Sequence, residues 1–298
     1  MGLSHAAMAG LLDPSAVIFL IEPNLKNRIL MSLVTGKNLR VKRSLTPSQV
    51  RAASHAVIAS PPTVHSSNVK NLIDCGFTGR LLVEKPVMVD PSLLRNFYYV
   101  MSGYVLTQAF FWKRLCSELI DKEIFSIHIA LETNQNFARI ENGWRSFAAR
   151  PGEMLLKEFG SHCVNLATEL TEENDFTLIE SGHNKLHIKN DRTPKISIDL
   201  LGASDRVRKS VYNVTVKCAS KIYRTDFYSF SVSDAHNDNE SVVETLASNG
   251  VHASAYLRGD DFARQMINFL DERYEDTNIN SALRTDTILS ELQSQMNA

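Results

Sequence analysis

Three short groups of residues carry the side chains best suited to chemistry. Ser60-Pro61-Pro62 is followed by His65, Glu84-Lys85-Pro86 comes about 20 residues later, and Glu158 precedes His162. An imidazole exchanges protons near neutral pH, so His162 is a candidate general base. The ammonium group of Lys85 could polarise a hydroxyl group and hold the charge that develops on its oxygen. These residue types together suit proton transfer at a hydroxyl group.

Apolar runs precede the first two groups and predict the strands that position them. Residues 16–21, 55–59 and 80–83 are short and rich in branched side chains, which is typical of strands buried on both faces of a parallel sheet. The carboxyl ends of such strands meet at one edge, where open α/β sheets bind ligands. We therefore expect Glu22, Ser60-Pro61-Pro62 and Glu84-Lys85-Pro86 to lie along one edge.

The remaining elements of the first 105 residues alternate with these strands. Helices are predicted at 4–12, 25–34, 63–75 and from 90 to about 101, with a weak strand at 39–43 and a short helix after Pro47. Strands that alternate with helices through short connections predict a doubly wound, Rossmann-like sheet.

The pattern changes after about residue 105. Helices are predicted at 111–121, 153–170, 259–272 and 281–296, and strands at 124–133 and throughout 176–233. The period-two alternation in this part predicts an antiparallel sheet with one solvated face. The fold class is therefore α/β, with a Rossmann-like domain at 1–105 and an α+β domain with an open antiparallel sheet at 106–298.

The segment from His55 to Pro86 resembles the Gfo/Idh/MocA oxidoreductases, which include glucose–fructose oxidoreductase and inositol dehydrogenase. The resemblance rests on a strand, Pro-Pro-x-x-His, a helix, a strand and Glu-Lys-Pro at this spacing. Glu158-Phe159-Gly160-Ser161-His162 is a second match, and Tyr256-Leu257-Arg258-Gly259 with Phe262 and Gln265 is a weaker third. The resemblance implies hydride transfer between a nicotinamide dinucleotide in the first domain and a sugar or polyol in the second, such as a nucleotide sugar or a cell-surface sugar precursor.

The resemblance also implies roles for individual residues. The catalytic set is Lys85, His162 and Glu158, and the substrate-binding set is Trp144, Arg145 and Asn165, with Arg145 facing an anionic group. The cofactor-binding set is Gly2, Glu22, Ser60, Pro61, Pro62, His65, Glu84 and Lys85. The carboxylate of Glu22 could accept hydrogen bonds from ribose and would repel a 2′-phosphate, which favours NAD over NADP. No metal site is expected, and family members often have a cis peptide bond before the proline equivalent to Pro86.

Several of these residues have a structural alternative. Lys85 could be a surface lysine beside a turn, and His162 could bond a carbonyl near the start of its helix. For His65 we favour a role as the cap of the helix that it opens. Glu22 could be a solvated turn residue, and Trp144 could be a packing residue.

Two features depart from the family. A dinucleotide fold begins with a strand and Gly-x-Gly-x-x-Gly, whereas this sequence starts at Met1-Gly2, so that Gly2 corresponds to the last glycine. We hypothesise that the start codon is assigned too late or that the gene is truncated; two neighbouring strands then lose a hydrogen-bonding partner. In addition, Glu158 stands where the family commonly has aspartate, and Asn165 where a second aspartate often follows.

Composition narrows the classes of function. Lys and Arg number 32 against 33 Asp and Glu in 298 residues, so there is no net field for nucleic acid or a membrane surface. No apolar run reaches the roughly 18 residues of a membrane span. The four cysteines are isolated, which fits reduced thiols in a cytoplasmic protein.

Two other functions stay open beside the oxidoreductase. The chain could be a non-catalytic nucleotide- or sugar-binding regulatory relative, or an inactive truncated product. We also expect a homodimer or homotetramer formed through the second sheet, because an apolar exposed face would be covered by another subunit. The residues that suggest this face are Val211, Val214, Val216, Ile222 and Tyr223.

Overall fold

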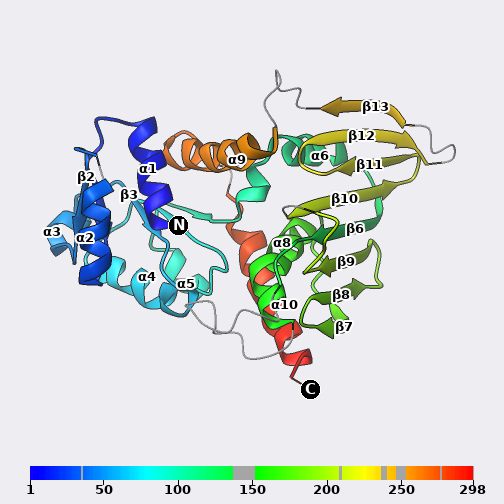
Figure 1. Cartoon of the computed structure of the whole chain (residues 1–298), viewed down its shortest axis with the longest axis horizontal. Coiled ribbons are helices and arrows are strands. Elements are labelled where there is room, and N and C mark those ends of the chain that lie inside the picture. Colours follow the sequence, from blue (N-terminus) through cyan, green and yellow to red (C-terminus); the bar gives the residue numbers. More distant parts are fainter. Residues whose placement is uncertain are drawn as a thin grey trace. The chain divides into compact units, whose positions relative to one another are not determined.

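The chain folds into two compact units (Figure 1). The computed structural model describes residues 1–34, 36–136, 152–207, 210–235, 240–245, 253–275 and 277–297. One unit comprises Met1–Gly103 with Phe262–Ile279, and the other comprises Tyr104–Asp261 with Asn280–Ala298. The predicted boundary at residue 105 is close to the observed one. The sequence analysis nevertheless placed 262–279 in the second domain, whereas Met266 and Phe269 complete a core of the first unit around Leu82 and Met101.

The first unit contains parallel strands in two separate sheets. Strand β1 (Ile18–Ile21) pairs with β2 (Leu39–Lys42), and β4 (Arg80–Val83) pairs with β3 (His55–Ile58) on one side and β5 (Tyr99–Ser102) on the other. The helices of this unit are α1 (Gly2–Leu12), α2 (Leu25–Val34), α3 (Pro47–Arg51), η1 (Pro62–Val64), α4 (His65–Asp74) and α5 (Pro91–Leu94). The predicted alternation of strands and helices is confirmed.

The predicted helix from 90 to about 101 is wrong beyond its first turn. Asp90 caps α5 by accepting the backbone N–H of Ser92, but the helix ends at Leu94. Residues Tyr99–Ser102 instead form β5, whose four residues are all buried beside β4. Pairing with a buried strand and burial of Tyr99, Val100 and Met101 outweigh the local preference for helix that Asp90-Pro91 begins.

Strands β1 and β3 are less buried than the sequence predicts. We expected both to be buried on each face, but the first three residues of each are half-buried, and Ile21 is exposed. Within the described residues, β1 pairs on one side with β2, and β3 on one side with β4. A strand with a single neighbour leaves its other edge accessible, which accounts for the difference.

The second unit is built on an eight-stranded sheet in the order β13-β12-β11-β10-β6-β9-β8-β7. Strands β6 and β9 are parallel and every other adjacent pair is antiparallel, so the prediction of an open, largely antiparallel sheet is confirmed. The strands are β6 (Ile124–Glu132), β7 (Thr177–Gly182), β8 (Lys185–Asn190), β9 (Lys195–Leu201), β10 (Val211–Cys218), β11 (Lys221–Thr225), β12 (Ser229–Asp234) and β13 (Glu240–Thr245).

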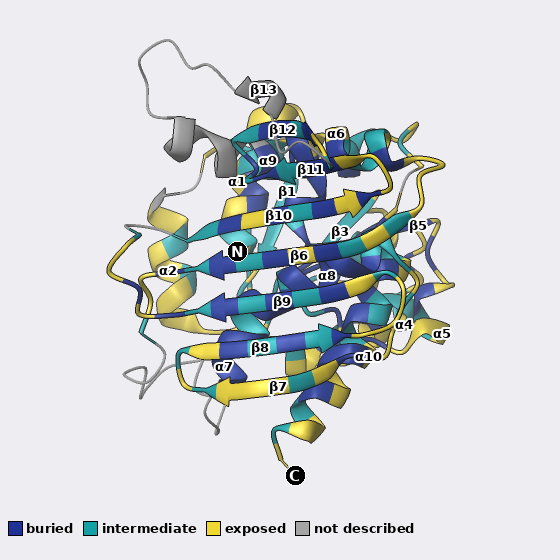
Figure 2. Ribbon diagram, turned by 90° about the vertical axis from the view of Figure 1, so that its right-hand side faces the viewer, coloured by how far each residue is buried: buried dark blue, intermediate teal, exposed yellow. Residues whose placement is uncertain are grey.

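Helices cover one face of this sheet, and the other face is open (Figure 2). The helical segments of the second part of the chain are η2 (Val105–Gln108), α6 (Phe110–Leu119), α7 (Glu153–Leu155), the π-helical turn η4 (Leu156–Gly160), α8 (Ser161–Leu170), α9 (Ala253–Leu270) and α10 (Ile279–Gln295). Helix α9 begins in the second unit and ends in the first. In the described ranges, no helix is both long and apolar enough to cross a bilayer.

The open face of the sheet differs from the one expected. Val214, Val216 and Tyr223 belong to the core beneath the helices, and their exposed fractions are at most 1%. The open face instead carries polar side chains such as His128 and Asp199, which lie within 3.6 Å of each other. The apolar face that motivated an oligomer is therefore not the open one, and the homodimer or homotetramer stays a prediction without that support.

Candidate functional site

The turn after β4 carries Lys85, and the Lys85–Pro86 peptide bond is cis, as the resemblance implies. Lys85 is half-buried, and its backbone N–H donates to Oε2 of Glu84 at 3.3 Å. The turn follows directly from a strand whose four residues are all buried. The backbone that presents Lys85 is therefore anchored in the best-packed part of the first unit.

Glu84 and His65 have partners inside the protein. Glu84 is 7% exposed and bonds to His5, while His65 is fully buried. The ring nitrogens of His65 lie 2.8 Å from the carbonyl oxygen of Ser60 and 3.1 Å from that of Val87. His65 does not cap its helix, because Val64 occupies that position without a side-chain bond. The prediction of a cap is wrong; the side chain links two loops instead.

Gly2, Glu22 and Ser60 belong to elements that meet at the carboxyl ends of β1 and β3. A Cβ placed on Gly2 would lie 3.6 Å from Leu20 of β1 and 3.7 Å from Ala59, which follows β3. Glu22 is half-buried directly after β1. The start of α1 therefore lies at the sheet edge where the sequence places the cofactor-binding residues.

The Glu22 and Ser60 side chains are held by local contacts. Oε1 of Glu22 accepts the backbone N–H of Asn24 at 2.8 Å. The guanidinium of Arg28 donates to the carbonyl oxygens of Glu22 and Pro23. The hydroxyl of Ser60 accepts Nδ2 of Asn68 at 2.9 Å, while Pro61 is exposed and Pro62 half-buried. The carboxylate of Glu22 thus stands in a turn that is fixed from both sides.

His162 lies in the second unit, in the first turn of α8, directly after the π-helical turn η4. Its ring makes edge contacts with Tyr104 and Tyr212, with ring centroids 5.6 and 6.3 Å away. Glu158 lies within η4 and is half-buried. π-helical turns inside helices are frequent at functional sites because they re-aim the side chains beside them. The structure therefore places the second predicted group at an aromatic site.

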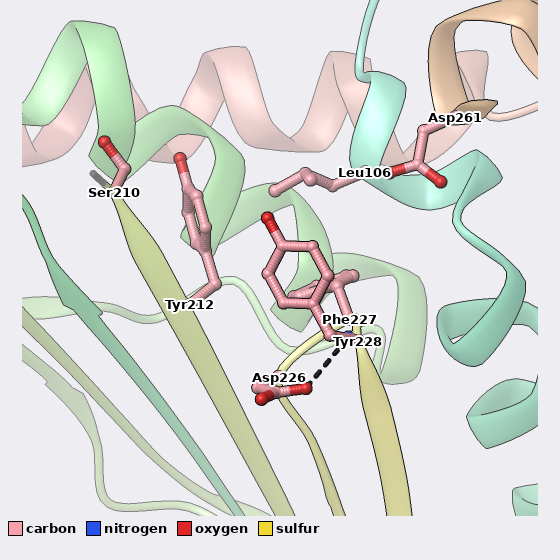
Figure 3. A pocket seen from close by; sticks show the side chains of 7 residues that line it. All are labelled: Leu106, Ser210, Tyr212, Asp226, Phe227, Tyr228 and Asp261. Carbon is pink, nitrogen blue, oxygen red and sulfur yellow. Dashed lines mark hydrogen bonds between the residues drawn. The ribbon is translucent and has the colours of Figure 1, made fainter. Parts of the chain in front are cut away.

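A small cavity is linked to this group through Tyr212, which lines the cavity and whose ring contacts that of His162 (Figure 3). Its volume is about 20 Å³, which is room for one water-sized group. In Figure 3 the hydroxyl ends of Tyr212 and Tyr228 point to the same side of the strands that carry them. The residues that line the cavity are Leu106, Ser210, Tyr212, Asp226, Phe227, Tyr228 and Asp261.

The floor of the cavity is a strained turn between β11 and β12. Phe227 has a φ of 68°, which is rare for a bulky residue. Oδ1 of Asp226 holds the turn by accepting the backbone N–H groups of Tyr228 and Ser229, at 2.8 and 2.6 Å. The ring of Phe227 stacks on Trp112, with centroids 6.1 Å apart. Such strain persists where the surroundings over-determine it, and it clusters at ligand sites.

The residues of this cavity were not predicted from the sequence. Tyr212, Asp226 and Tyr228 lie in strands and a turn that were predicted as sheet, without any motif that would separate them from packing residues. A β-hairpin turn that holds an aspartate before two aromatic residues was the one available signal.

Asn165, a predicted substrate-binding residue, has its partners inside the protein. Asn165 is 1% exposed and donates from Nδ2 to the hydroxyl groups of Ser281 and Thr285, at 3.4 and 3.2 Å. This network joins α8 to α10 in the core of the second unit. Trp144 and Arg145 lie outside the described residues.

The cysteine next to His162 is buried and unreactive. Cys163 follows this histidine directly, and complete burial raises the pKa of its thiol well above the usual range. Among the residues that the structure describes, no three His, Cys, Asp or Glu side chains are grouped so that they could hold a metal ion. Among the described residues of this unit, we consider His162 and Glu158 for proton transfer and the cavity for binding a polar group.

Comparison with solved structures places this fold among dehydrogenases. A dehydrogenase (MviM) from Clostridium difficile is 15% identical, with a TM-score of 0.70 over 99% of this chain and 96% of its own. UDP-N-acetylglucosamine 3-dehydrogenase GnnA from Acidithiobacillus ferrooxidans is 12% identical, with a TM-score of 0.73 over 99% and 94%. Levoglucosan dehydrogenase, solved with NADH and levoglucosan, is 12% identical, with a TM-score of 0.70 over 99% and 94%.

These likenesses cover nearly the whole chain and establish its fold, a Rossmann-like unit joined to an open-sheet α+β unit. No model of a protein family matches the sequence. No curated protein sequence matches it either. At such low identity the similarity concerns the architecture, and the chemistry must be argued from the residues themselves.

Proposed function

We propose that this protein is an oxidoreductase that uses NAD and acts on a hydroxyl group of a sugar or polyol. The observation that carries the proposal is the cavity lined by Tyr212, whose ring contacts that of His162. Hydroxyl and carboxyl groups of Tyr212, Tyr228 and Asp261 line a space of the size of one hydroxyl group. A general base next to hydrogen-bonding groups of this kind suits the removal of a proton from an alcohol.

The residues present fit a dinucleotide in part. The first backbone N–H groups of α1 have no side-chain cap, and the uncapped start of a helix favours phosphate. The carboxylate of Glu22 suits ribose hydroxyl groups and disfavours a 2′-phosphate, so we propose NAD rather than NADP. Because β1 and β3 each pair on one side in the described residues, we propose that the Gly-x-Gly strand of a dinucleotide fold is absent from between them.

When bound, the nicotinamide ring would accept a hydride from the substrate or donate one to it. In our proposal, Lys85 polarises the reacting hydroxyl group and His162 takes its proton. Glu158 acts with His162, and the hydroxyl groups of Tyr212 and Tyr228 hold a neighbouring substrate hydroxyl. Glu84, His65 and Asn165 have buried partners within the chain, and we assign them structural roles.

The names of three neighbours support the chemical class. One was solved with NADH and levoglucosan, and another with NAD+, L-tartaric acid and magnesium. A third is named for the oxidation of a nucleotide sugar. We therefore propose a hydroxyl-rich small molecule as the substrate.

The test is turnover of a panel of neutral sugars, polyols, amino sugars and nucleotide sugars in the presence of NAD. The absorbance of the NADH that forms measures the rate. We expect activity with at least one member. Lys85→Ala and His162→Ala should each lower kcat by about 10²- to 10⁴-fold, the usual contribution of a positioned acid or base. Lys70→Ala serves as the matched control, because Lys70 lies exposed on α4 of the same unit as Lys85.

Two results would overturn the proposal. One is a folded protein that binds NADH but turns over no member of the panel, which would favour a regulatory relative. The other is an activity that survives Lys85→Ala as well as it survives Lys70→Ala.

A further inference from the structure

The carboxylate of Glu84 is enclosed immediately before Lys85. Its Oε1 lies 2.5 Å from Nε2 of His5, and its Oε2 accepts the backbone N–H of Lys85 at 3.3 Å. On its remaining side lies Gly103, where an added Cβ would come within 2.7 Å of Oε2. These three neighbours restrict where the Glu84 carboxylate can lie. The backbone at the start of the Lys85 turn is therefore tied to His5.

His5 is itself fixed by the helix that returns from the far end of the chain. It is 2% exposed, and its Nδ1 lies 3.2 Å from the sulfur of Met266. Its ring packs on Phe262, with centroids 4.7 Å apart. Met266 and Phe262 belong to α9, and His5 belongs to α1. The contact with Glu84 thus joins the Lys85 turn to two helices distant in sequence.

A second histidine holds the other end of the same turn. The fully buried ring of His65 lies between the carbonyl oxygens of Ser60 and Val87. Glu84 precedes Lys85 by one residue and Val87 follows it by two. The segment that contains Lys85 and Pro86 is therefore bounded on both sides by contacts to buried imidazoles, one from α1 and one from α4.

We propose that His5 and His65 are positioning residues, which together hold the turn so that the Lys85 ammonium group is presented in one place. This inference rests on the proposed function in assigning chemistry to Lys85. A lysine side chain is long and flexible, so its reach is defined by where its backbone is anchored. A displacement of about 1 Å at a reacting group can cost about a hundredfold in rate.

The test follows Lys85 directly. Lysines of the full-length protein are reductively methylated with ¹³C-formaldehyde, and the Lys85 signal is identified by its loss in Lys85→Arg. We expect His5→Leu and His65→Leu each to shift or broaden that signal, while the conservative His5→Gln, which keeps a donor for Glu84, restores it in part.

The matched control is His55→Leu. His55 lies in the same unit, its ring also contacts α9, at Phe269, and its hydrogen bond is to Ser54, outside the turn. We expect this variant to leave the Lys85 signal in place. In the turnover assay, His5→Leu should lower kcat at least tenfold per folded molecule, with the folded fraction measured by circular dichroism, while the KM for the sugar stays within threefold.

The inference is overturned if the Lys85 signal is unchanged in both leucine variants while they remain folded. Should His5→Leu fail to fold, Glu84→Leu, which removes the oxygens that bond to His5 and to the Lys85 N–H, replaces it, and an unmoved Lys85 signal in that folded variant overturns the inference equally. Absence of turnover with every substrate would count against the proposed function. The NMR signal of Lys85 tests the positioning role of His5 and His65 independently of turnover.

Discussion

The two parallel sheets of the first unit differ sharply in how they are packed. Four large apolar side chains of helix α2, which follows β1, are more than half exposed. These are Leu25, Ile29, Leu30 and Leu33, with exposed fractions of 63%, 55%, 55% and 77%. In β4, by contrast, Leu81, Leu82 and Val83 are completely buried.

The residues proposed to bind the cofactor are divided between these two sheets. Glu22 stands at the end of β1, in the weakly packed sheet, whereas Lys85 follows β4 in the well-packed one. Burial of a leucine side chain contributes about 1.5–3 kcal/mol relative to its exposure. The sheet that carries the proposed catalytic lysine is therefore supported by far more buried apolar surface than the sheet that carries the ribose-binding carboxylate.

Arg80 reinforces the same sheet. Its guanidinium is 2% exposed and donates to the carbonyl oxygens of Asn268, Phe269 and Tyr274, at the end of α9 and just beyond it. It also lies over the ring of Tyr99, 3.7 Å from the centroid. These bonds satisfy carbonyl groups that a helix end leaves without partners. The strand that leads to Lys85 is thus joined to the returning helix at its start and, through Glu84 and His5, after its end.

The largest expected contrast is between two leucine-to-alanine substitutions, one in β4 and one in helix α2, which follows β1. Leu82→Ala should lower the free energy of unfolding by about 2–5 kcal/mol, because it leaves a cavity in a closed core. Leu33→Ala, on the exposed face of α2, should change it by no more than about 0.5 kcal/mol. Urea unfolding of both variants measures the difference. Equal losses would mean that α2 is as well packed as β4 and would break the comparison.

A smaller, residue-level contrast is expected in amide hydrogen exchange. The amides of β4 lie between two paired strands, whereas β1 pairs on one side in the described residues. Amides that open without global unfolding exchange faster. We expect β1 amides to exchange at least about a hundredfold faster than those of β4, as read by NMR or mass spectrometry. Equal protection would show that both sheets open together.

The smallest effect concerns His55 at the start of β3. Burial, with a further contribution from the charge of Arg80, lowers the pKa of its imidazole. The unfolded chain therefore takes up a proton at this residue first as the pH falls through about 6.5, and the folded state loses stability over that range. His55→Gln should flatten this part of the stability curve. NMR titration of His55 at or above the ordinary value would contradict the expectation.

Strands β1, β3 and β4 of the first unit were predictable from local pattern, and β5 was not. Residues 80–83 form an apolar run with a polar stop, and β4 matches it residue for residue. Tyr99–Ser102 follows a proline-capped turn that resembles the start of a helix, and its strand state depends on pairing with β4. Patterns local in sequence identify elements, whereas burial of β1 and β3 depends on which neighbours they have.

The residues of the candidate site also differ in whether the local sequence could point to them. Lys85, Glu22 and His162 could be identified because each stands at a motif or at the end of a predicted strand. His5 had no such signal, since its importance comes from Glu84 and from Met266, which lies 261 residues away. The cavity beside Tyr212 depends on a hairpin turn whose φ at Phe227 no sequence pattern specifies.

The most direct test of the central claim is a fluorescence titration of NADH into this 298-residue chain. The account predicts saturable binding at micromolar concentration, weakened by Glu22→Ala and unaffected by Glu275→Ala, an exposed carboxylate of the same unit. A folded protein that shows no saturable binding of NADH would contradict the proposal that this chain is an NAD-dependent oxidoreductase.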